Sequence, residues 1–453
     1  MKKLFGTDGM RGEAGKFPLD AETVKIVGAS LARQFSEKNG GKAPKFIIGC
    51  DTRESGAWLE AAFSVGAESE GAKVISAGII TTPGVAFLTR EQKADAGIVV
   101  SASHNPFHDN GIKIFSTTGK KIDGSTERRI EAEIFSVEER ALGAETKRTA
   151  NTEQRTANEL QNRYLNYLVS EFPGLSLIGL KMVVDCANGA ASDLAPCLFK
   201  KLGASVTSIF NQPDGKNINA DCGSLHLEKL QATVNAEKAD FGVAYDGDAD
   251  RALFVDEKGN VVDGDATLWA MAMHLKSRGA LAKNLVVATV MSNLGLEMAL
   301  KSEKIELIRT AVGDKYVLDK LLETGAAIGG EQSGHIIFPN KSLVGDGILT
   351  TLALLEAMQE NRSTLSELTR GFVRYPQILV NVRVREKVPF EDVPEICAAV
   401  ESIENALGEK GRLLLRYSGT EPLARVMIEG ENQDEIAEQA NELAEIIREK
   451  LAK

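Results

Sequence analysis

The fold class of this chain follows from residues 45–78, which read KFIIGCDTRESGAWLEAAFSVGAESEGAKVISAG. A short apolar run rich in β-branched residues is followed by a polar loop, a helical stretch and a second apolar run. This order is typical of two parallel strands joined by a helix in a right-handed crossover. The same order returns in residues 180–210 and 284–313, so we predict three βαβ units.

Another strand that ends in a polar loop follows each of these units. The loops occur in KADAGIVVSASHNP (residues 93–106), KADFGVAYDGDADR (238–251) and GAAIGGEQSGHII (325–337). A three-fold α/β repeat therefore accounts for residues 1 to about 370. Since ligand-binding loops of parallel sheets lie at the carboxyl ends of strands, we expect functional residues in these three loops.

The end of the chain departs from this repeat. PQILVNVRV and GRLLLRYSGTEPLARVMIEG predict strands around a polar turn, and QDEIAEQANELAEIIREKLAK predicts an amphipathic closing helix. The fold class is therefore α/β, with three repeated α/β/α domains whose sheets are mixed but largely parallel, and a smaller C-terminal α+β domain. The expected domains are residues 1–150, 151–256, 257–370 and 371–453.

Composition narrows the classes of partner. The chain has 453 residues and a net charge of −11, which argues against nucleic acid or an anionic membrane as the main partner. Local clusters of Lys and Arg can still bind an anionic small molecule. The five cysteines are scattered without a CxxC pair, which predicts reduced thiols and a cytoplasmic location. Neither a signal peptide nor a membrane-spanning segment is expected. The oligomeric state stays open, with a homodimer as the assembly considered.

The loop YDGDADR carries three carboxylates two positions apart, on Asp246, Asp248 and Asp250. Such a loop needs a cation to offset the repulsion, and ligation by oxygen alone suits a hard ion such as Mg²⁺. An acidic solvated turn is the structural alternative. An EF-hand Ca²⁺ loop is a second alternative, since Glu257 stands at its twelfth position, but Arg251 replaces the glycine required at the sixth. Arg251 is also a candidate phosphate-binding cation.

The loop SASHNP places Ser103 and His104 directly after an apolar strand. A serine at a strand end is either a nucleophile or phosphoryl carrier, or a turn residue that hydrogen-bonds its own backbone. No G-x-S-x-G elbow is present, so the pair is not by itself a hydrolase signature. Lys113 lies on a strand that returns from this loop and is either functional or a solvated surface lysine.

Two further stretches mix charges with hydroxyl groups. GGEQSGHII places Glu331, Ser333 and His335 at alternate positions, which puts them on one side of an extended segment, where they suit sugar hydroxyls; a polar hairpin turn is the alternative. RYSGTEPLAR predicts a phosphate clamp, or else a simple turn between strands. The clamp candidates are Arg416, Ser418, Gly419, Thr420 and Arg425. Arg11 in FGTDGMRG has a similar glycine-rich setting.

Over the whole chain, five stretches in order resemble the α-D-phosphohexomutase family. They are FGTDGMRG, SASHNPFHDNGIKIF, DGDADR, GGEQSGH and RYSGTEPLARVMIEG. SASHNP and DGDADR are highly specific as a pair, and the first and last stretches favour the branch of the family that acts on glucosamine phosphates. One departure is Ala249, where the family usually has glycine. If that position has a positive φ, alanine strains the loop by roughly 1 kcal/mol or more.

The resemblance implies four domains around one central cleft and assigns roles to the candidate residues. Ser103 would carry a phosphoryl group, and Asp246, Asp248 and Asp250 would hold Mg²⁺ together with an oxygen of the phosphoserine. Lys113 and Arg11 would lie at the reaction centre, with Lys113 favoured over His104 as the proton handler because neighbouring cations would lower its pKa. Glu331 and Ser333 would bind sugar hydroxyls. The residues implied to hold the phosphate that does not react are Arg416, Ser418, Gly419 and Thr420.

The implied reaction is the interconversion of glucosamine 6-phosphate and glucosamine 1-phosphate. It would proceed through phosphoserine and a glucosamine 1,6-bisphosphate, which would also serve as activator. The product would feed the synthesis of UDP-N-acetylglucosamine and cell-wall precursors. A phosphoglucomutase or phosphomannomutase activity is the first alternative, and a Mg²⁺-dependent sugar phosphohydrolase is a more distant one.

Overall fold

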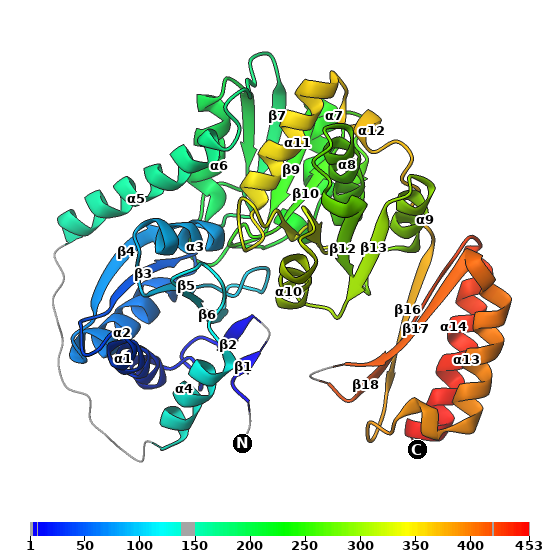
Figure 1. Ribbon diagram of the computed structural model, residues 1–453, viewed down its shortest axis with the longest axis horizontal. Helices are drawn as coiled ribbons and strands as arrows, with labels where there is room; N and C mark the ends of the chain where they lie inside the picture. The colour runs from blue at the N-terminus through cyan, green and yellow to red at the C-terminus, as the bar shows by residue number, and fades with distance from the viewer. Residues whose placement is uncertain (1–2, 7, 137–149, 419–420, 453) are drawn as a thin grey trace. The chain divides into compact units, whose positions relative to one another are not determined.

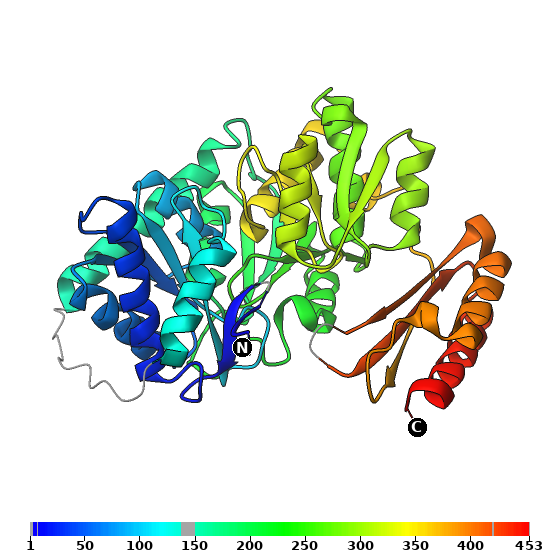
Figure 2. The same ribbon diagram turned by 60° about the horizontal axis from the view of Figure 1, so that its bottom comes forward.

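A computed structural model describes residues 3–6, 8–136, 150–418 and 421–452 of the chain (Figures 1 and 2). The described residues form four β-sheets of six, five, four and three strands. By its internal contacts the chain divides into two compact units. The first comprises residues 1–290 and 308–370, and the second comprises residues 291–307 and 371–453.

The six-stranded sheet has the order β1-β2-β6-β5-β3-β4. Its strands are β1 (Phe5–Gly6), β2 (Gly9–Glu13), β3 (Lys45–Cys50), β4 (Lys73–Ile79), β5 (Ala96–Val100) and β6 (Asp109–Ser116). Its helices are α1 (Ala21–Lys38), α2 (Gly56–Ser69), α3 (Thr82–Glu91), α4 (Gly124–Ser136) and α5 (Ala150–Ser170). Helices α1, α2 and α4 pack together on one face and share a hydrophobic core with the strands, while α3 contacts β3 and β5 and packs against α5.

The five-stranded sheet has the order β11-β10-β9-β7-β8. Its strands are β7 (Lys181–Asp185), β8 (Ser205–Ile209), β9 (Phe241–Tyr245), β10 (Ala252–Val255) and β11 (Val261–Val262), with helices α6 (Ala191–Lys201) and α7 (Glu228–Glu237). Strand β11 pairs with β10, so the sheet continues past residue 256, where the sequence placed a domain boundary. The turn after Asp256 is therefore a hairpin inside this sheet.

The four-stranded sheet has the order β13-β12-β14-β15. Its strands are β12 (Leu285–Thr289), β13 (Glu306–Thr310), β14 (Gly329–Gly330) and β15 (Ile336–Ile337). The helices of this region are α8 (Gly264–Ser277), α9 (Leu294–Ser302), α10 (Asp314–Thr324), α11 (Gly347–Asn361) and α12 (Leu365–Leu368).

These three sheets contain one repeated arrangement of four strands. The orders β4-β3-β5-β6, β8-β7-β9-β10 and β13-β12-β14-β15 correspond position by position. In each sheet a parallel pair (β3 with β5, β7 with β9, β12 with β14) is followed by an antiparallel strand. The three-fold α/β repeat is therefore confirmed, and the three polar loops do follow the carboxyl ends of β5, β9 and β14.

The three-stranded sheet has the order β16-β18-β17 and belongs to the second unit. It is built from β16 (Gln377–Arg383), β17 (Gly411–Tyr417) and β18 (Leu423–Gly430), with α13 (Pro394–Leu407) and α14 (Gln433–Ile447). The two helices pack on one face of the sheet, as Figure 1 shows, around a core that includes Val426, Ile436 and Leu443. The predicted closing helix and the strands around a polar turn are confirmed.

Short helical turns complete the described elements: η1 (Gly223–Leu225), η2 (Ala282–Asn284), η3 (Phe390–Asp392), η4 (Gly408–Lys410) and η5 (Arg448–Ala452). All five cysteines are free thiols. No helix among the described residues combines the length and the apolar character needed to cross a membrane.

Close packing of α1 on α2 depends on a glycine, and this yields a first prediction. A Cβ added to Gly66 would lie 1.9 Å from the carbonyl oxygen of Lys25, so Gly66→Ala must push the helices apart. We expect Gly66→Ala to lower the free energy of unfolding by about 1–3 kcal/mol, the usual cost of overpacking. Denaturant unfolding followed by circular dichroism measures this. Gly174→Ala is the control, since its added Cβ has no neighbour within 4 Å; equal losses in both variants would contradict the prediction.

Candidate active site

Ser103 lies in the turn after β5 and is almost fully buried, with 1% of its surface exposed. Its backbone has a φ of 55°, in the left-handed region that serine rarely occupies. The Oγ atom of Ser103 donates a hydrogen bond to Oδ2 of Asp246 at 2.5 Å. The serine of the first repeat is therefore hydrogen-bonded to the aspartate loop of the second repeat.

The aspartate loop follows β9 and brings its three carboxylates together. Asp246, Asp248 and Asp250 are buried and offer oxygen atoms that all lie within 4.8 Å of one another. Burial and the charges of Asp250 and Asp248 raise the pKa of Asp246 well above its usual value. Oδ2 of Asp248 accepts hydrogen bonds from Thr82 Oγ1 at 2.5 Å and from Lys113 Nζ at 2.8 Å.

These carboxylates fit a hard divalent cation. Oδ1 of Asp248 and Oδ1 of Asp250 are buried and accept no hydrogen bond from the described residues, although His335 Nδ1 and Arg251 Nε lie 3.6 and 3.8 Å from Oδ1 of Asp250. A buried anionic oxygen without a hydrogen bond is costly, and a cation can offset that cost. Since every available ligand atom of the three aspartates is a carboxylate oxygen, the set matches the preference of Mg²⁺-like ions. The EF-hand alternative is excluded, because the Glu257 carboxylate is instead hydrogen-bonded to Ser366.

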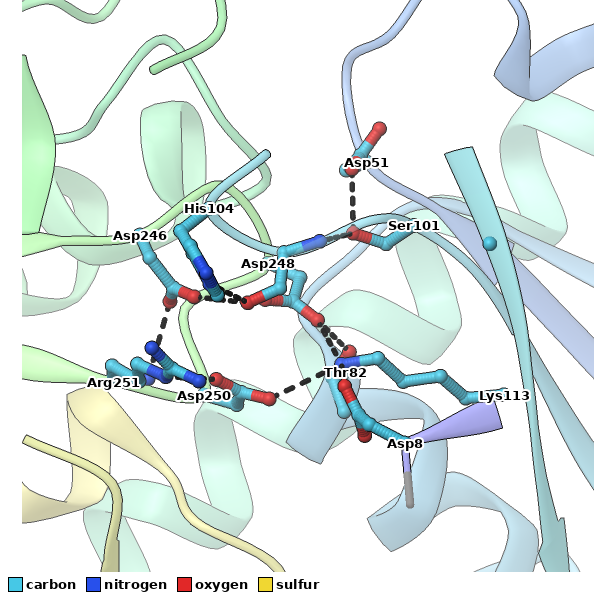
Figure 3. Close-up of polar contacts among 12 residues, drawn as sticks. Asp8, Asp51, Thr82, Ser101, His104, Lys113, Asp246, Asp248, Asp250 and Arg251 are labelled. Carbon is cyan, nitrogen blue, oxygen red and sulfur yellow. Dashed lines mark hydrogen bonds and ion pairs between the residues drawn. The ribbon is translucent and has the colours of Figure 1, made fainter. Parts of the chain in front are cut away.

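Lys113 points from β6 into the aspartate loop, as Figure 3 shows. Its Nζ atom lies 2.8 Å from Asp248, 3.2 Å from Asp250 and 3.1 Å from Asp8, and its side chain is 1% exposed. Burial alone would lower the pKa of Lys113, but the charges of Asp248, Asp8 and Asp250 outweigh it and raise that pKa well above its usual value. The expected lowering by neighbouring cations is therefore wrong, because carboxylates, not cations, make the nearest contacts.

His104 lies beside the serine, with its Nδ1 3.4 Å from Ser103 Oγ. Burial lowers the pKa of His104 to about 4, and the charges of Arg251 and Arg11 act in the same direction. The imidazole is therefore neutral near pH 7 and has a lone pair available to accept a proton.

Two arginines at the site have unsatisfied donors. The Nε atoms of Arg11 and Arg251 are buried and find no hydrogen-bond acceptor among the described residues. Arg11 is paired with Asp8 through its other end, and Arg251 Nε lies 3.8 Å from Asp250. The site thus contains donors and carboxylate oxygens that make no hydrogen bond, so it suits an anion such as a phosphoryl group as well as a cation.

The loop after β14 is a hairpin turn and not an extended segment. The N–H of Glu331 donates to the carbonyl of His335, and the N–H of Gly334 donates to the carbonyl of Glu331, both at 3.0 Å. The prediction that Glu331, Ser333 and His335 share one side of an extended chain is therefore wrong, because the chain reverses between β14 and β15. Glu331 and Ser333 are half-buried and stay candidates for sugar binding.

His335 has a different environment from its two neighbours. It is 4% exposed, and its Nε2 accepts a hydrogen bond from the N–H of Gly345 at 3.0 Å. Its Nδ1 lies 3.6 Å from Asp250. These contacts hold the hairpin against the aspartate loop. A role of His335 in binding sugar stays a prediction, and its burial counts against it.

The predicted phosphate clamp lies in the second unit, on β17 and β18. Arg416 and Arg425 are direct cross-strand partners, and burial together with Arg425 lowers the pKa of Arg416. The Nε of Arg425 is buried without a hydrogen-bond acceptor in the part of the chain that the structure describes. Two like charges opposite each other destabilise a sheet unless an anion binds them. Ser418 is buried at the end of β17, and Gly419 and Thr420 lie outside the described residues.

Several site residues were not singled out from the sequence. Asp8 bridges Lys113 and Lys121, and Lys121 also pairs with Asp314 at the start of α10. Thr82 begins α3, and Lys387 donates to the carbonyl of Ser418 at 2.6 Å. A signal existed only for Asp8, which lies inside the FGTDGMRG stretch. Lys121 lies six residues beyond the SASHNPFHDNGIKIF stretch, and the others are distant in sequence from every motif. Only tertiary contacts identify them as parts of the site.

Ala249 occupies the position where the family usually has glycine. Its φ is 53° and it is fully buried, so the expected positive φ is confirmed. Hydrogen bonds hold this conformation on both sides. The Ala249 N–H donates to the carbonyl of Asp246, and the carbonyl of Ala249 accepts from Gly347 at the start of α11, both at 3.0 Å.

Comparison with known proteins agrees with this geometry. Models of the phosphoglucomutase/phosphomannomutase family match the chain in four consecutive parts: α/β/α domain I at residues 2–141, domain II at 162–259, domain III at 263–375 and the C-terminal domain at 379–446. Phosphoglucosamine mutase of Solibacter usitatus is 49% identical, covering 99% of this chain and 98% of that protein. Phosphoglucosamine mutase of Citrifermentans bemidjiense is 48% identical, covering 100% and 99%.

A solved structure has the same fold. The crystal structure of a phosphoglucomutase/phosphomannomutase family protein from Burkholderia thailandensis superposes with a TM-score of 0.79 at 25% identity. The superposition covers 98% of this chain and 97% of that one.

The aspartate loop yields a prediction on divalent cations. We expect Mg²⁺ to raise the unfolding temperature of chelator-treated protein, because it offsets the repulsion of three buried carboxylates; saturation to 100 times Kd corresponds to about 2.7 kcal/mol. Asp250→Asn should lose most of this gain in differential scanning calorimetry. Asp185→Asn is the matched control and should keep the gain in unfolding temperature. Asp185 is another buried aspartate at a strand end, but its carboxylate accepts hydrogen bonds from backbone N–H groups. Equal gains in the two variants would contradict the assignment.

Asp346 yields a prediction on how the stability of the protein depends on pH. Its side chain caps the N-terminus of α11, next to Gly347, whose N–H donates to the carbonyl of Ala249. Burial raises the pKa of Asp346 from 3.8 to about 6, although Leu349 N–H and the Tyr164 hydroxyl bind its carboxylate. Between these values the folded protein binds a proton that the unfolded chain releases, so its free energy of unfolding falls as pH rises from 3.8 to about 6.

Asp346→Asn removes this ionisation and can keep both hydrogen bonds. Relative to the natural protein, the variant should gain up to about 3 kcal/mol in stability between pH 4 and pH 7, measured by urea unfolding. Asp20→Asn at the partly exposed N-cap of α1 is the control for replacing a capping aspartate. If the free energy of unfolding differs between Asp346→Asn and the natural protein by the same amount at pH 4 and at pH 7, the raised pKa of Asp346 is disproved.

Proposed function

Since this chain belongs to the phosphoglucomutase/phosphomannomutase family, we propose that it is an isomerase that interconverts glucosamine 6-phosphate and glucosamine 1-phosphate. The choice of substrate is supported by the full-length relatives, which are phosphoglucosamine mutases. The product would supply the synthesis of UDP-N-acetylglucosamine and of cell-wall precursors. A cytoplasmic location and a homodimer stay predictions.

One observation carries the proposal: the hydroxyl of Ser103 lies 2.5 Å from Asp246, inside a site with unsatisfied groups of both signs. Phosphoryl transfer requires charge neutralisation and alignment more than covalent help from the protein. A phosphoryl group on Ser103 would meet the orphaned donors of Arg11 and Arg251. The orphaned oxygens of Asp248 and Asp250 would hold the cation that such a group attracts.

We propose Mg²⁺ as that cation, held by Asp246, Asp248 and Asp250 together with an oxygen of the phosphoserine. When bound, it would neutralise charge on the phosphoryl oxygens. Ser103 would donate its phosphoryl group to the free hydroxyl of the sugar phosphate, which forms glucosamine 1,6-bisphosphate. The bisphosphate would then return its other phosphoryl group to Ser103, so that one isomer is converted to the other and the phosphoserine is restored. The same bisphosphate would act as activator by phosphorylating the free serine.

Proton transfer is assigned differently from the sequence prediction. Because three carboxylates raise the pKa of Lys113, this lysine is a cation that offsets their charge and stabilises charge on the transferred group. We propose His104 as the proton acceptor on its position, because it is neutral near pH 7 and lies 3.4 Å from Ser103 Oγ; its lowered pKa makes it a weak base.

Substrate binding would use the hairpin after β14 and the predicted phosphate clamp on β17 and β18. Glu331 and Ser333 would bind sugar hydroxyls. Arg416, Ser418 and Arg425, joined by Gly419 and Thr420, would bind the phosphate that is not being transferred. A backbone-rich clamp with two arginines suits phosphate at either end of the sugar, which a reorienting bisphosphate requires.

Two other activities use the same chemistry. A phosphoglucomutase or phosphomannomutase would differ in its contacts to the sugar hydroxyls. A Mg²⁺-dependent phosphohydrolase would release inorganic phosphate in step with substrate loss, whereas a mutase releases none.

The decisive prediction concerns Ser103. Intact-mass and peptide mass spectrometry should find one phosphate on the peptide containing Ser103, and Ser103→Ala should lose it. Turnover of glucosamine 1-phosphate should fall at least about 1,000-fold, because the phosphoryl carrier is gone. Ser136→Ala, at the exposed end of α4, is the control.

The turnover assay, applied to the natural protein, also ranks glucosamine, glucose and mannose phosphates as substrates. Glucosamine phosphate is expected to rank first. Full mutase activity in Ser103→Ala would refute the mechanism. Stoichiometric release of phosphate by the natural protein would indicate the hydrolase instead.

A further inference from the structure

We propose that Arg53 and Asn219 are positioning residues that clamp the phosphoserine loop and hold Ser103 against the aspartate loop. This inference rests on the proposed function, since it assumes that Ser103 is the phosphoryl carrier. Neither side chain bonds to the Ser103 hydroxyl. Both act on the backbone carbonyl groups of Ser103 and Asn105.

Arg53 forms the arm that comes from the first repeat. Its Nη2 atom donates to the carbonyl oxygens of Ser103 at 2.9 Å and Asn105 at 2.8 Å, and its Nη1 donates to that of Pro106 at 2.5 Å. Its Nε is bound to Asp51 Oδ2 at 2.9 Å, and neither side chain of this ion pair is exposed. A buried guanidinium that is paired with a carboxylate and donates to three carbonyls is rigid, because its fork geometry is satisfied on every side.

Asp51 extends the same arm to the start of the loop. Besides Arg53, it accepts a hydrogen bond from the Ser101 hydroxyl at 2.6 Å, and that hydroxyl accepts one from the Ser103 N–H at 2.9 Å (Figure 3). The N–H and the carbonyl of Ser103 are therefore both held by groups that lead back to Asp51. The peptide units on either side of the nucleophile cannot rotate independently.

Asn219 forms the arm that comes from the second repeat. Its Nδ2 atom donates to the carbonyl of Ser103 at 2.9 Å and to that of Asn105 at 3.0 Å, the same two oxygens that Arg53 binds. Its own backbone has a φ of 58° and is tied by its N–H to the carbonyl of Ala187 at 2.9 Å. The loop between β8 and η1 thus brings a side-chain amide to a fixed point on the first repeat.

Gly247, in the aspartate loop, completes the enclosure of the Ser103 carbonyl. A Cβ at this position would lie 2.6 Å from the Ser103 oxygen and 3.0 Å from Asn219 Nδ2, so only glycine lets the two loops approach this closely. This accounts for the glycine between Asp246 and Asp248 by close approach of the backbone.

The clamp has a physical reason to exist. A left-handed conformation costs a non-glycine residue on the order of 1 kcal/mol or more, so an unrestrained Ser103 would relax to negative φ. Rotation of that residue would move Oγ away from Asp246, and misplacement by about 1 Å can slow a reaction about 100-fold. Because one arm comes from each repeat, the clamp also fixes the distance between the serine loop and the aspartate loop.

The test uses the full-length protein with two variants and a matched control. Asn219→Gly removes the amide yet tolerates the positive φ at this position. Arg53→Lys keeps the charge beside Asp51 but loses the fork. Asn217→Ala is the control, because Asn217 belongs to the same loop and its amide instead bonds the carbonyl of Gln212.

Two readouts are required. Single-turnover transfer from the phosphorylated protein to glucosamine 1-phosphate, and steady-state kcat, should fall about 10- to 100-fold in Asn219→Gly and Arg53→Lys, with KM within about twofold of the natural value. Hydrogen exchange of the peptide covering residues 101–106 should become faster in both variants. Asn217→Ala should change neither readout.

The outcomes separate the clamp from the proposed function. Unchanged transfer and unchanged loop protection in both variants would overturn the clamp, and so would a rise in KM at constant kcat, which would indicate substrate binding. Faster loop exchange with slower transfer would support it. Since loop exchange is measured without any sugar, a natural protein that fails to interconvert glucosamine phosphates while the variants lose loop protection would overturn the proposed function and retain the clamp.

Discussion

The candidate active site depends on the electrostatic repulsion among three buried carboxylates. Asp246, Asp248 and Asp250 gather their oxygens within 4.8 Å. Two unit charges 4 Å apart repel by about 4 kcal/mol at an effective dielectric constant of 20, so the loop requires compensation. The buried ammonium group of Lys113 and the hydroxyls of Ser103 and Thr82 supply part of it. The remaining oxygens without hydrogen bonds make the loop a candidate cation site, and a cation beside the buried lysine would suit a phosphoryl group.

The three-fold repeat explains how such a site is assembled. Each repeat presents a loop at the carboxyl end of corresponding strands, β5, β9 and β14. The first loop carries the serine, the second the carboxylates and the third the hairpin with Glu331. Two of these loops contain a non-glycine residue with positive φ, Ser103 and Ala249, and hydrogen bonds from other elements hold both. Local strain at the site is thus balanced by contacts between repeats.

The sequence predicted the large features of the fold because they depend on local patterns. Alternation of apolar runs with helical stretches is enough to indicate βαβ units, and their recurrence is enough to indicate a repeat. The three aspartates were found because their spacing is itself a chemical signal. The errors arose where tertiary contacts reverse a local expectation. The chain turns at residues 331–335, where Gly334 has a φ of 89° and backbone hydrogen bonds join Glu331 to Gly334 and His335. The pKa of Lys113 rises because carboxylates from two other segments surround it.

The sequence by itself determined the fold class and the repeat, because their patterns recur along the chain, and the three metal-ligand candidates, because residue type and spacing in one stretch indicate them. The role of Ser103 as phosphoryl carrier came from the resemblance to the α-D-phosphohexomutase family, since its own loop fitted a simple turn residue as well. Only the tertiary structure decided which residues hold the serine and the aspartates in position. Asp8, Arg53 and Asn219 act from segments that lie far from the serine or the aspartates in sequence. Their roles depend on hydrogen bonds and ion pairs a few ångströms long, and such distances exist only once the strands have brought separate loops to the same place.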